Sequence, residues 1–406
     1  MTRGAAGTVL ILLVSSMFLN YLDRGSLSVA APVLARDLDI GPSRMGLLFS
    51  AFFWTYALCQ IATGWVVDRA PVKWVYAGGF LLWSLATLAT GFAGGFAALF
   101  ACRLMLGLGE SAAYPACSRI LVRSVAEQHR GVANAWIDAA TKMGPALSNL
   151  AGGLIVEQWG WRWLFFGAGA LSLLWLPAWI ALYRDPGGTS GAQPAQVSFG
   201  GILRRKEAWG MSLAMFALGY VWYFLLSWLP QYLVHSRGFT MKQVAGFGSL
   251  PLAMMAAATM VWAWLADRRV ARGSANERRR FLILGLLLSA VLLPPAALAG
   301  DVWVSLALLI AAHVMLGMFA ANVWAVTQTL AGPAAAGRWT GIQNAIGNMG
   351  GVVSPWVAGV AVEKTGSFTP AFLAAAVVAT AGAVCLWRLV PEVAPVHFGR
   401  SAQADG

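Results

Sequence analysis

Long apolar stretches recur along the whole 406-residue chain, and they constrain its fold more than any other feature. The hydrocarbon core of a bilayer is about 30 Å thick, and about 20 residues of helix cross it. The sequence contains twelve stretches of this kind. Apolar residues make up 59% of the chain and charged residues 11%, whereas roughly 25% of a soluble domain is charged. The sequence therefore predicts an all-α integral membrane protein with twelve membrane-spanning helices.

Six of the predicted spans precede a polar segment and six follow it. The spans are residues 9–34, 45–67, 74–92, 97–121, 132–156, 163–183, 211–233, 244–266, 281–299, 302–330, 340–361 and 372–390. Residues 184–207 are rich in Gly, Ser, Pro and charge, which is typical of a surface linker. We expect an N-terminal six-helix bundle (1–185), a cytoplasmic linker (186–207), a C-terminal six-helix bundle (208–391) and a cytoplasmic tail (392–406).

The distribution of Lys and Arg predicts the orientation, because cytoplasmic loops keep positive charge. Of 28 basic residues, three lie inside spans and six in loops on one side. The remaining 19 lie on the side that holds both termini and the linker. Both termini are therefore expected in the cytoplasm of a multi-pass protein of a bacterial-type inner membrane. This topology accounts for the net charge of +12, so no nucleic-acid partner is expected.

The two halves resemble each other at the end of the second span of each. Gly64-Trp-Val-Val-Asp68-Arg69 closes the second span, and Ala263-Trp-Leu-Ala-Asp267-Arg268 closes the eighth. Such repeats are typical of transporters in which one half rocks against the other. We predict that these are gating loops, although an ordinary basic cytoplasmic loop would look similar.

Six charged residues lie inside apolar spans: Asp23, Arg24, Arg103, Glu110, Asp138 and Lys142. An ionisable group in the bilayer costs at least about 2.5–3.5 kcal/mol and is usually functional. These residues predict a substrate and ion pathway. The alternative is a static ion network that holds helices together.

The loop GWVVDR resembles the signature of the major facilitator superfamily, although Pro71 stands where Gly is usual. The runs NYLDR, RLMLGLGESAAYPA, WYFLLSWLPQYLV and GIQNAIGNMGGVVSP resemble its anion:cation symporter family. That family includes bacterial sugar-acid transporters, such as the D-galactonate transporter, and the animal sialin and vesicular glutamate transporters. The resemblance covers nearly the full length and implies the major facilitator fold, two pseudo-symmetric six-helix bundles.

The resemblance also implies roles for individual residues. Asp23 and Glu110 match the protonatable pair of the proton-coupled members, and Arg24 matches the usual anion ligand. Residues that match others lining the family's site are Tyr56, Arg103, Trp324 and Asn344. From the residues alone, desolvation favours the protonated form of a buried carboxyl and a nearby guanidinium favours the carboxylate. An anion that takes Arg24 away from Asp23 would therefore couple substrate to proton.

The chain departs from the sugar-acid transporters at two positions. Thr141 replaces a Gln that contacts substrate hydroxyls, and Ala321 replaces a small polar contact. Beside Thr141, the i, i+4 pair Asp138 and Lys142 is either self-neutralising or supplies a second cationic contact for a dicarboxylate or an α-keto or hydroxy acid. Aromatic walls are expected from Tyr21, Tyr56, Tyr223 and Trp324. These features favour a small or aromatic carboxylate over a polyol.

We therefore predict proton-coupled symport of a small organic anion by alternating access. An organic-anion exporter or a potential-driven facilitator of the same fold is the alternative. A receptor would need a soluble output domain, and an intramembrane enzyme would need a catalytic constellation, which the sequence does not show. No cofactor or metal is predicted, and we expect a monomer. His313 could be a proton relay, although a lone His on an apolar helix is more often a core residue.

Overall fold

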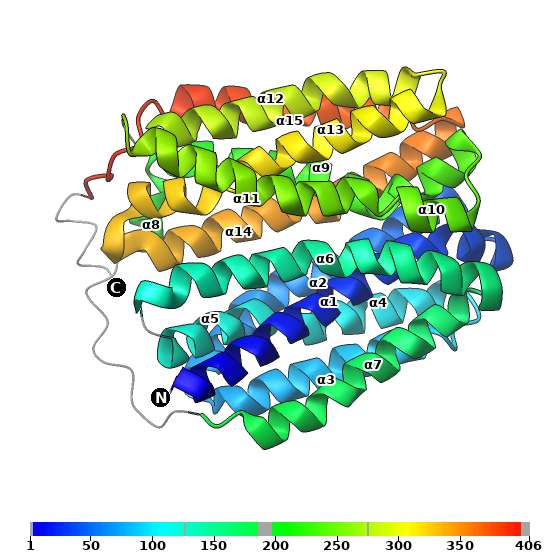
Figure 1. Cartoon of the computed structure of the whole chain (residues 1–406), viewed down its shortest axis with the longest axis horizontal. Coiled ribbons are helices and arrows are strands. Elements are labelled where there is room, and N and C mark those ends of the chain that lie inside the picture. The colour runs from blue at the N-terminus through cyan, green and yellow to red at the C-terminus, as the bar shows by residue number, and fades with distance from the viewer. Residues whose placement is uncertain (1–2, 126, 186–196, 274–275, 399–406) are drawn as a thin grey trace. The chain divides into compact units, whose positions relative to one another are not determined.

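The chain is helical throughout the part that the computed structural model describes, residues 3–125, 127–185, 197–273 and 276–398. Figure 1 shows the helices, which run in sequence order from α1 to α15. The first seven are α1 (Arg3–Asp37), α2 (Pro42–Arg69), α3 (Val72–Thr90), α4 (Phe96–Glu110), α5 (Ala113–Ser124), α6 (Glu127–Trp159) and α7 (Trp161–Leu182).

The later helices begin in the predicted linker. Its residues 186–196 lie outside the described part, and Ser198 caps a short helix, α8 (Phe199–Leu203). The others are α9 (Lys206–Arg237), α10 (Met241–Phe247), α11 (Leu250–Val270), α12 (Asn276–Leu298), α13 (Val302–Ala320), α14 (Val323–Thr365) and α15 (Thr369–Leu389).

Nine of the predicted spans correspond to a single helix or to part of one, and the other three are interrupted and contain parts of two helices. The fourth consists of α4 and α5, the eighth of α10 and α11, and the tenth of α13 and the start of α14. Helix α14 also contains the eleventh span. A turn at Gly332, where φ is 61°, separates the eleventh span from the tenth. A positive φ of this size is strained for other residues, so the glycine permits the connection between the two spans.

Nine helical segments of the described chain are long and apolar enough to cross a membrane by hydropathy alone. The other three spans are α1, α2 and α6, with 35, 28 and 33 residues. They are also long enough to cross a bilayer. Helices α1 and α6 carry Asp23, Arg24, Asp138 and Lys142, four of the charged residues of the expected site.

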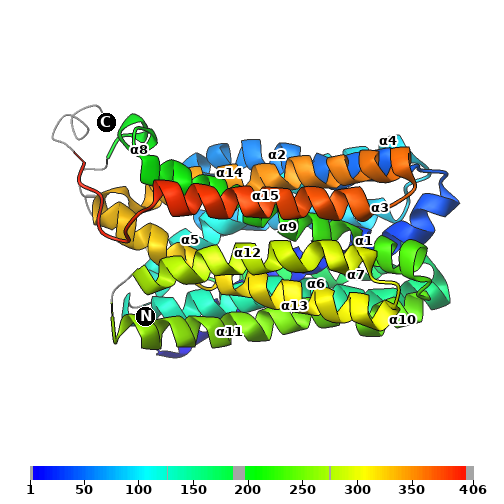
Figure 2. The same ribbon diagram turned by 90° about the horizontal axis from the view of Figure 1, so that it is seen from above.

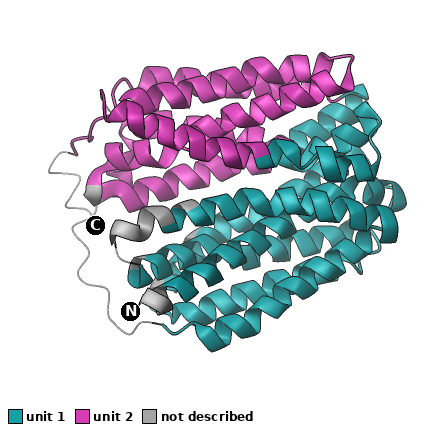
Figure 3. Cartoon of the chain, viewed as in Figure 1, with its two compact units in different colours: residues 1–188, 226–253, 355–367 teal, residues 189–225, 254–354, 368–406 magenta. Residues whose placement is uncertain are grey.

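The chain divides into two compact units, which Figure 3 distinguishes by colour. Unit 1 contains residues 1–188 together with 226–253 and 355–367. Unit 2 contains residues 189–225, 254–354 and 368–406. Two segments from the second half of the sequence therefore pack with the first half, and the domain boundaries inferred from the sequence remain a prediction.

In unit 1, close helix approach depends on small residues. Helix α6 packs along α1, where a side chain on Gly144 would meet the carbonyl oxygen of Phe18 at 2.6 Å. A Cβ on Gly25 would come within 3.0 Å of Ser148. Both contacts advance in the same direction along the two helices, so α1 and α6 run parallel. The register places each residue of α1 level with a residue about 123 positions later in α6.

The segments 226–253 and 355–367 cover one end of unit 1. Ser28 donates to the carbonyl oxygens of Leu226 and Ser227 at 2.6 and 2.8 Å, and Asn149 donates to that of Gly248 at 2.9 Å. These bonds join α1 and α6 to chain segments that follow them by about a hundred residues or more. At this end of unit 1, the helices of the two sequence halves are in contact.

Two glycines allow α2 and α14 to pack closely at the same end of unit 1. A Cβ on Gly46 of α2 would meet the carbonyl oxygen of Pro355 at 2.5 Å, and one on Gly359 of α14 would meet that of Pro42 at 2.4 Å. The obstacle is backbone in both cases, so a side chain cannot be accommodated by rotation. The carboxylate of Glu363 also accepts from the N–H of Ser43 at 2.8 Å, at the start of α2.

Unit 2 repeats this style of packing. Figure 2 shows α12 alongside α13 and α15, its main neighbours. Helices α9 and α14 touch backbone to backbone, since a Cβ on Gly219 would lie 2.2 Å from the carbonyl oxygen of Gly347. The glycine-rich run 347–351 is thus a helix-packing surface, as expected for small residues between spans.

The internal repeat seen in the sequence extends to local contacts. Arg69 stacks on Trp65 with its guanidinium carbon 4.3 Å from the ring centroid, and Arg268 stacks on Trp264 at 3.8 Å. Both pairs are four residues apart at the end of the second span of a half. The two halves therefore carry the same arrangement at corresponding positions, which supports their pseudo-symmetry.

Candidate functional site

A break in the fourth span places Glu110 inside unit 1. Helix α4 ends at Glu110 and α5 begins three residues later. The hydroxyl of Thr63 donates to the carbonyl oxygen of Ser111 at 2.9 Å, so a backbone group at the break has a partner. Irregular backbone at membrane depth requires such compensation. Gly107 lets α4 approach α2, because a Cβ there would meet the carbonyl oxygen of Phe52 at 2.2 Å.

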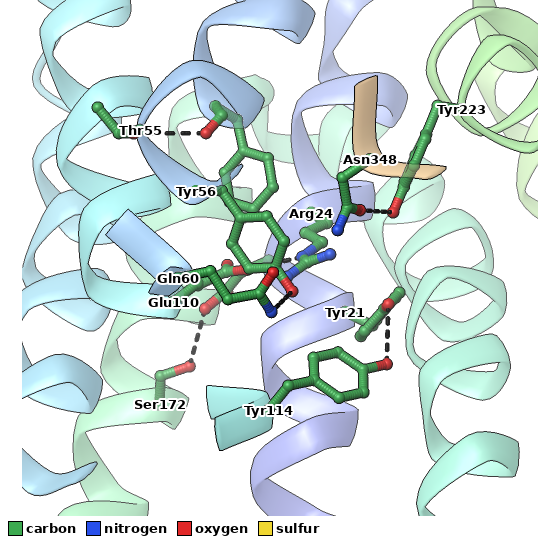
Figure 4. Close-up of polar contacts among 12 residues, drawn as sticks. Tyr21, Arg24, Thr55, Tyr56, Gln60, Glu110, Tyr114, Ser172, Tyr223 and Asn348 are labelled. Carbon is green, nitrogen blue, oxygen red and sulfur yellow. Dashed lines mark hydrogen bonds and ion pairs between the residues drawn. The ribbon is translucent and has the colours of Figure 1, made fainter. Parts of the chain in front are cut away.

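Arg24 and Glu110 form a buried ion pair, drawn at the centre of Figure 4. The Nε of Arg24 donates to Oε2 of Glu110 over 2.6 Å. Their side chains are 3% and 0% exposed. Charge-assisted bonds of this length are among the strongest in proteins, and isolating either charge would be costly. The pair joins α1 to the break after α4.

Three aromatic rings surround the Arg24 guanidinium. Its central carbon lies 4.5 Å from the ring centroid of Tyr21, 4.7 Å from Phe52 and 4.6 Å from Tyr56. Ring faces attract a cation, more strongly where water is scarce. The hydroxyl of Tyr21 bonds that of Tyr114 over 3.1 Å. The cage fixes the guanidinium, and the predicted walls Tyr21 and Tyr56 belong to it.

Asp23 lies on a different side of α1, and this corrects the expectation that Arg24 is its partner. Its Oδ2 accepts from the hydroxyl of Ser172 on α7 over 3.3 Å. Consecutive helical residues point about 100° apart, so neighbours in sequence do not face each other. Asp23 is 1% exposed and therefore buried like Glu110. The two carboxyls are held separately, and the guanidinium pairs with Glu110.

Arg103 is buried on the same face of α4 as Glu110, two turns earlier, and the bond that the structure shows for its Nε goes elsewhere. Its Nε donates to the carbonyl oxygen of Leu48 over 3.3 Å. Its guanidinium carbon is 5.2 Å from the ring of Phe52, which also contacts Arg24. Phe52 therefore contacts both guanidinium groups.

The pair Asp138 and Lys142 is formed on α6. The Nζ of Lys142 lies 2.5 Å from Oδ1 of Asp138 and 3.4 Å from its carbonyl oxygen. The lysine side chain is 8% exposed and the aspartate side chain 50%. Thr141 is buried, and its hydroxyl donates to the carbonyl oxygen of Asp138 at 2.7 Å. Thr141 thus lacks the amide group of a glutamine, and its hydroxyl is hydrogen-bonded within its own helix.

The site residues predicted in the second half belong to unit 2. Tyr223 of α9 donates to Oδ1 of Asn348 on α14 over 3.0 Å (Figure 4). These residues are next to the contact between Gly219 and Gly347. Trp324 and Asn344, both on α14, are half-buried. Their role in lining a site remains a prediction.

His313 is fully buried in α13. Its Nδ1 lies 2.8 Å from the carbonyl oxygen of Leu309, one turn earlier on the same helix. A bond within one helix positions the ring and does not link it to the charged residues of the spans. This contact fits a core residue better than a relay.

Of the two repeated Asp-Arg loops, the structure shows the contacts of the aspartate only in the second. The side chain of Asp68 lies outside the described part, and a Cβ on Gly64 would meet nothing within 4 Å. In the second half, Asp267 forms an ion pair with Arg278, which also donates to Oδ1 of Asn322 over 3.2 Å. That asparagine lies in the break between α13 and α14. The second loop is therefore tied to the interrupted tenth span.

Sequence reasoning missed several partners of the site. They are Phe52, Gln60, Tyr114 and Ser172. Phe52 precedes Tyr56 by one helical turn, so the helical period could have found it. Ser172 lies on α7, whose sequence shows no polar stripe that would have pointed to Asp23. Among the described residues, no three His, Cys, Asp or Glu side chains gather as metal ligands.

The fold and this buried charge cluster define a multi-pass membrane transporter. The chain matches the Major Facilitator Superfamily over residues 13–276 and 273–404, and it belongs to that family. The family resemblance inferred from the sequence motifs is therefore confirmed, as are the twelve-helix fold class and the expectation that the chain is not an enzyme.

Similar proteins include a probable sulfoacetate transporter of Cupriavidus necator, 31% identical and covering 90% of each chain. The D-galactonate transporter of Escherichia coli is 29% identical and covers 95% of each. Among solved structures, a bacterial homolog of the lysosomal transporter Spinster has a TM-score of 0.78 at 17% identity, with 96% of each chain covered. The nucleoside transporter NupG has a TM-score of 0.75 at 15% identity, covering 94% of this chain and 99% of its own.

Proposed function

We propose that this chain is a proton-coupled symporter of small organic anions that carry a carboxylate. The observation that carries the proposal is the ion pair of Arg24 and Glu110, buried inside a cage of aromatic rings. A guanidinium has five N–H donors in a fork that matches a carboxylate, and its bond to Glu110 uses the one on Nε. An incoming carboxylate can replace Glu110 with equivalent chemistry.

The same exchange supplies the coupling. When the substrate takes Arg24, the carboxylate of Glu110 is left buried without its cation, which is strongly unfavourable. Binding a proton removes that charge. Asp23, held by Ser172, is the second proposed proton site. The neutralised pocket can then close, because burying an unpaired charge is what would oppose closure. Loss of the proton on the other side returns Glu110 to Arg24 and expels the anion.

The relatives support an acid as substrate. Their names specify sulfoacetate, D-galactonate and galactarate or D-glucarate. In this chain Thr141 is bonded to its own helix, and the guanidinium lies among rings. We propose a small or aromatic carboxylate, with Tyr21, Tyr56 and Arg103 around Arg24. The further contacts proposed are Thr141, Lys142, Tyr223, Trp324 and Asn344.

The proposed orientation places the end of unit 1 that the segments 226–253 and 355–367 cover on the outer side of the membrane. With both termini and most Lys and Arg in the cytoplasm of an inner membrane, the contacts of Ser28, Gly46 and Gly359 lie at the outer end. We propose that the structure has its outer gate closed. We also propose that the chain works as a monomer, because one polypeptide supplies both halves of the gate.

Replacing Gly46 by alanine is expected to keep this gate from closing, since the new Cβ would lie 2.5 Å from a backbone oxygen. A cysteine at Ser28, in a chain whose four native cysteines are replaced, reports the state of the gate. Labelling by an impermeant maleimide from outside should rise about 10-fold or more, the result of a shift of roughly 1.4 kcal/mol. Gly167→Ala is the control, because nothing lies within 4 Å of a Cβ there. Equal labelling in both variants would argue against the gate.

The function itself is tested with the purified protein. A thermal-shift panel of carboxylates at two pH values identifies an anion that stabilises the folded state. Uptake of that anion into proteoliposomes is then measured with and without an inward proton gradient. Symport predicts accumulation driven by the gradient with no membrane potential applied. Uptake that follows only the potential would indicate a facilitator, and accumulation driven by an opposed gradient would indicate an exporter.

A further inference from the structure

The pair of Asp138 and Lys142 lies on the face of α6 that turns away from lipid. The exposed apolar residues of this helix form one stripe, Trp136, Met143, Leu147, Leu150 and Leu154. At about 100° per residue, positions 138, 142, 149 and 153 lie together on the opposite side. An aspartate whose side chain is 50% exposed on that side faces water and not acyl chains.

Part of the same face packs against the segment 226–253. Asn149 donates to the carbonyl oxygen of Gly248, and a Cβ on Gly153 would meet Ala245 at 2.8 Å. There the face is covered by the segment 226–253. Further toward the N-terminal end of α6 the face carries Asp138 and Lys142, and Asp138 remains exposed. The pair therefore lies on the part of this face that the segment 226–253 does not cover.

The register of α1 and α6 relates this pair to Arg24. Gly144 contacts Phe18 and Leu22, and Gly25 contacts Ser148, so Lys142 is level with about residue 19 of α1. Arg24 is then about five residues, or about 7.5 Å along the axis, from the level of Lys142. Both side chains are long. Their cationic ends can be bridged by a short molecule with an acid group at each end.

The bonding of Lys142 also fits an exchangeable cation. An ammonium has three donors, and the bonds that the structure shows for it both go to Asp138. One side of the pair is buried and the other is open to water, so an anion can approach the lysine by displacing its exposed partner. A pair that only neutralised itself in a span would need no such opening.

We infer that Lys142 is a specificity-determining residue, which binds the second acid group of a dianionic substrate while Arg24 binds the first. This inference rests on the proposed function. Asp138 occupies the ammonium when no dianion is present and competes with it. The substrate class is a short molecule with two acid groups, carboxylate or sulfonate, separated by a few carbon atoms.

The test measures uptake into proteoliposomes of the anion that the thermal-shift panel identifies, and compares how strongly monoanions and dianions inhibit it. The probes are acetate, lactate and benzoate against malonate, succinate and sulfoacetate. Lys142→Gln should raise the half-inhibitory concentration of the dianions about 10-fold or more, the loss of one charge-assisted contact, and change that of the monoanions by less than about 3-fold. Asp138→Asn should lower the value for dianions, because it removes the competitor and keeps the ammonium. Lys206→Gln, an exposed lysine of α9, is the control.

The double variant Asp138→Asn/Lys142→Gln separates this role from a structural pair. A self-neutralising pair can be removed as a unit, so the double variant would regain the wild-type preference among anions. A binding role for Lys142 predicts that the double variant keeps the dianion defect of Lys142→Gln. Recovery of wild-type selectivity, or an equal shift for both classes of anion, would overturn the inference. If no anion of either class competes in the wild type, the proposed function fails as well.

Discussion

Replacing Arg24 by alanine is expected to abolish substrate binding and transport. The guanidinium is the buried cation inside the cage of Tyr21, Phe52 and Tyr56, and the proposed carboxylate has to bond it. Each hydrogen bond to a charged group contributes about 1.5–3 kcal/mol, so losing a two-pronged contact lowers affinity by at least about 100-fold. The measurement is a titration with the stabilising anion, followed by uptake in proteoliposomes.

This variant needs a control for folding, because it leaves Glu110 without its partner at 2.6 Å. Removing one member of a buried pair costs about 3–5 kcal/mol. The double variant Arg24→Ala/Glu110→Gln removes both charges, so it should recover thermal stability and still bind no anion. Arg36→Ala, at a side chain that is 77% exposed, should behave as the wild type. Binding within about 3-fold of the wild type in the double variant would exclude Arg24 from the site.

The fold could be predicted from sequence because a bilayer imposes a strong and repetitive pattern. The apolar lengths located every span, and the pair of Asp-Arg motifs marked the repeat. Interruptions within spans were harder to predict. The breaks at Glu110 and Asn322 and the turn at Gly332 lie within sequence that is otherwise apolar. The long apolar stretch that predicts a span therefore does not show where its helix is interrupted.

The sequence predicted most of the charged residues of the site, but it did not predict which of them form ion pairs. Charge inside apolar spans pointed to Asp23, Arg24 and Glu110, because only function or pairing offsets its cost. Which carboxyl meets the guanidinium depends on the rotation of α1 against α4 and α7, and sequence neighbours gave the wrong partner. The bond of Ser172 to Asp23 and the contact of Phe52 with two arginines join separate helices, so they required coordinates.

Glu110→Gln is expected to separate exchange from uphill transport. Glutamine keeps the size of the side chain and an oxygen that can accept from Nε of Arg24, but it cannot gain or lose a proton. The variant imitates the protonated carrier, which is the form that binds the anion and changes conformation. Counterflow of substrate between equal pH values should stay within about 10-fold of the wild type, the scale of one modest change in binding. Accumulation driven by a proton gradient should be lost.

The structure makes Glu110 the more direct coupling residue and assigns Asp23 a separate test. Glu110 shares the guanidinium with the substrate, whereas Asp23 bonds Ser172 on α7. Asp23→Asn, measured in the same two assays, shows whether a second proton site is needed. Glu157→Gln is the matched control, since that carboxylate is exposed on α6. Full accumulation by Glu110→Gln under a pH gradient would make its ion pair structural. Loss of counterflow together with accumulation would also contradict the scheme, because an anion that replaces Glu110 at Arg24 does not need the negative charge of Glu110 in order to bind.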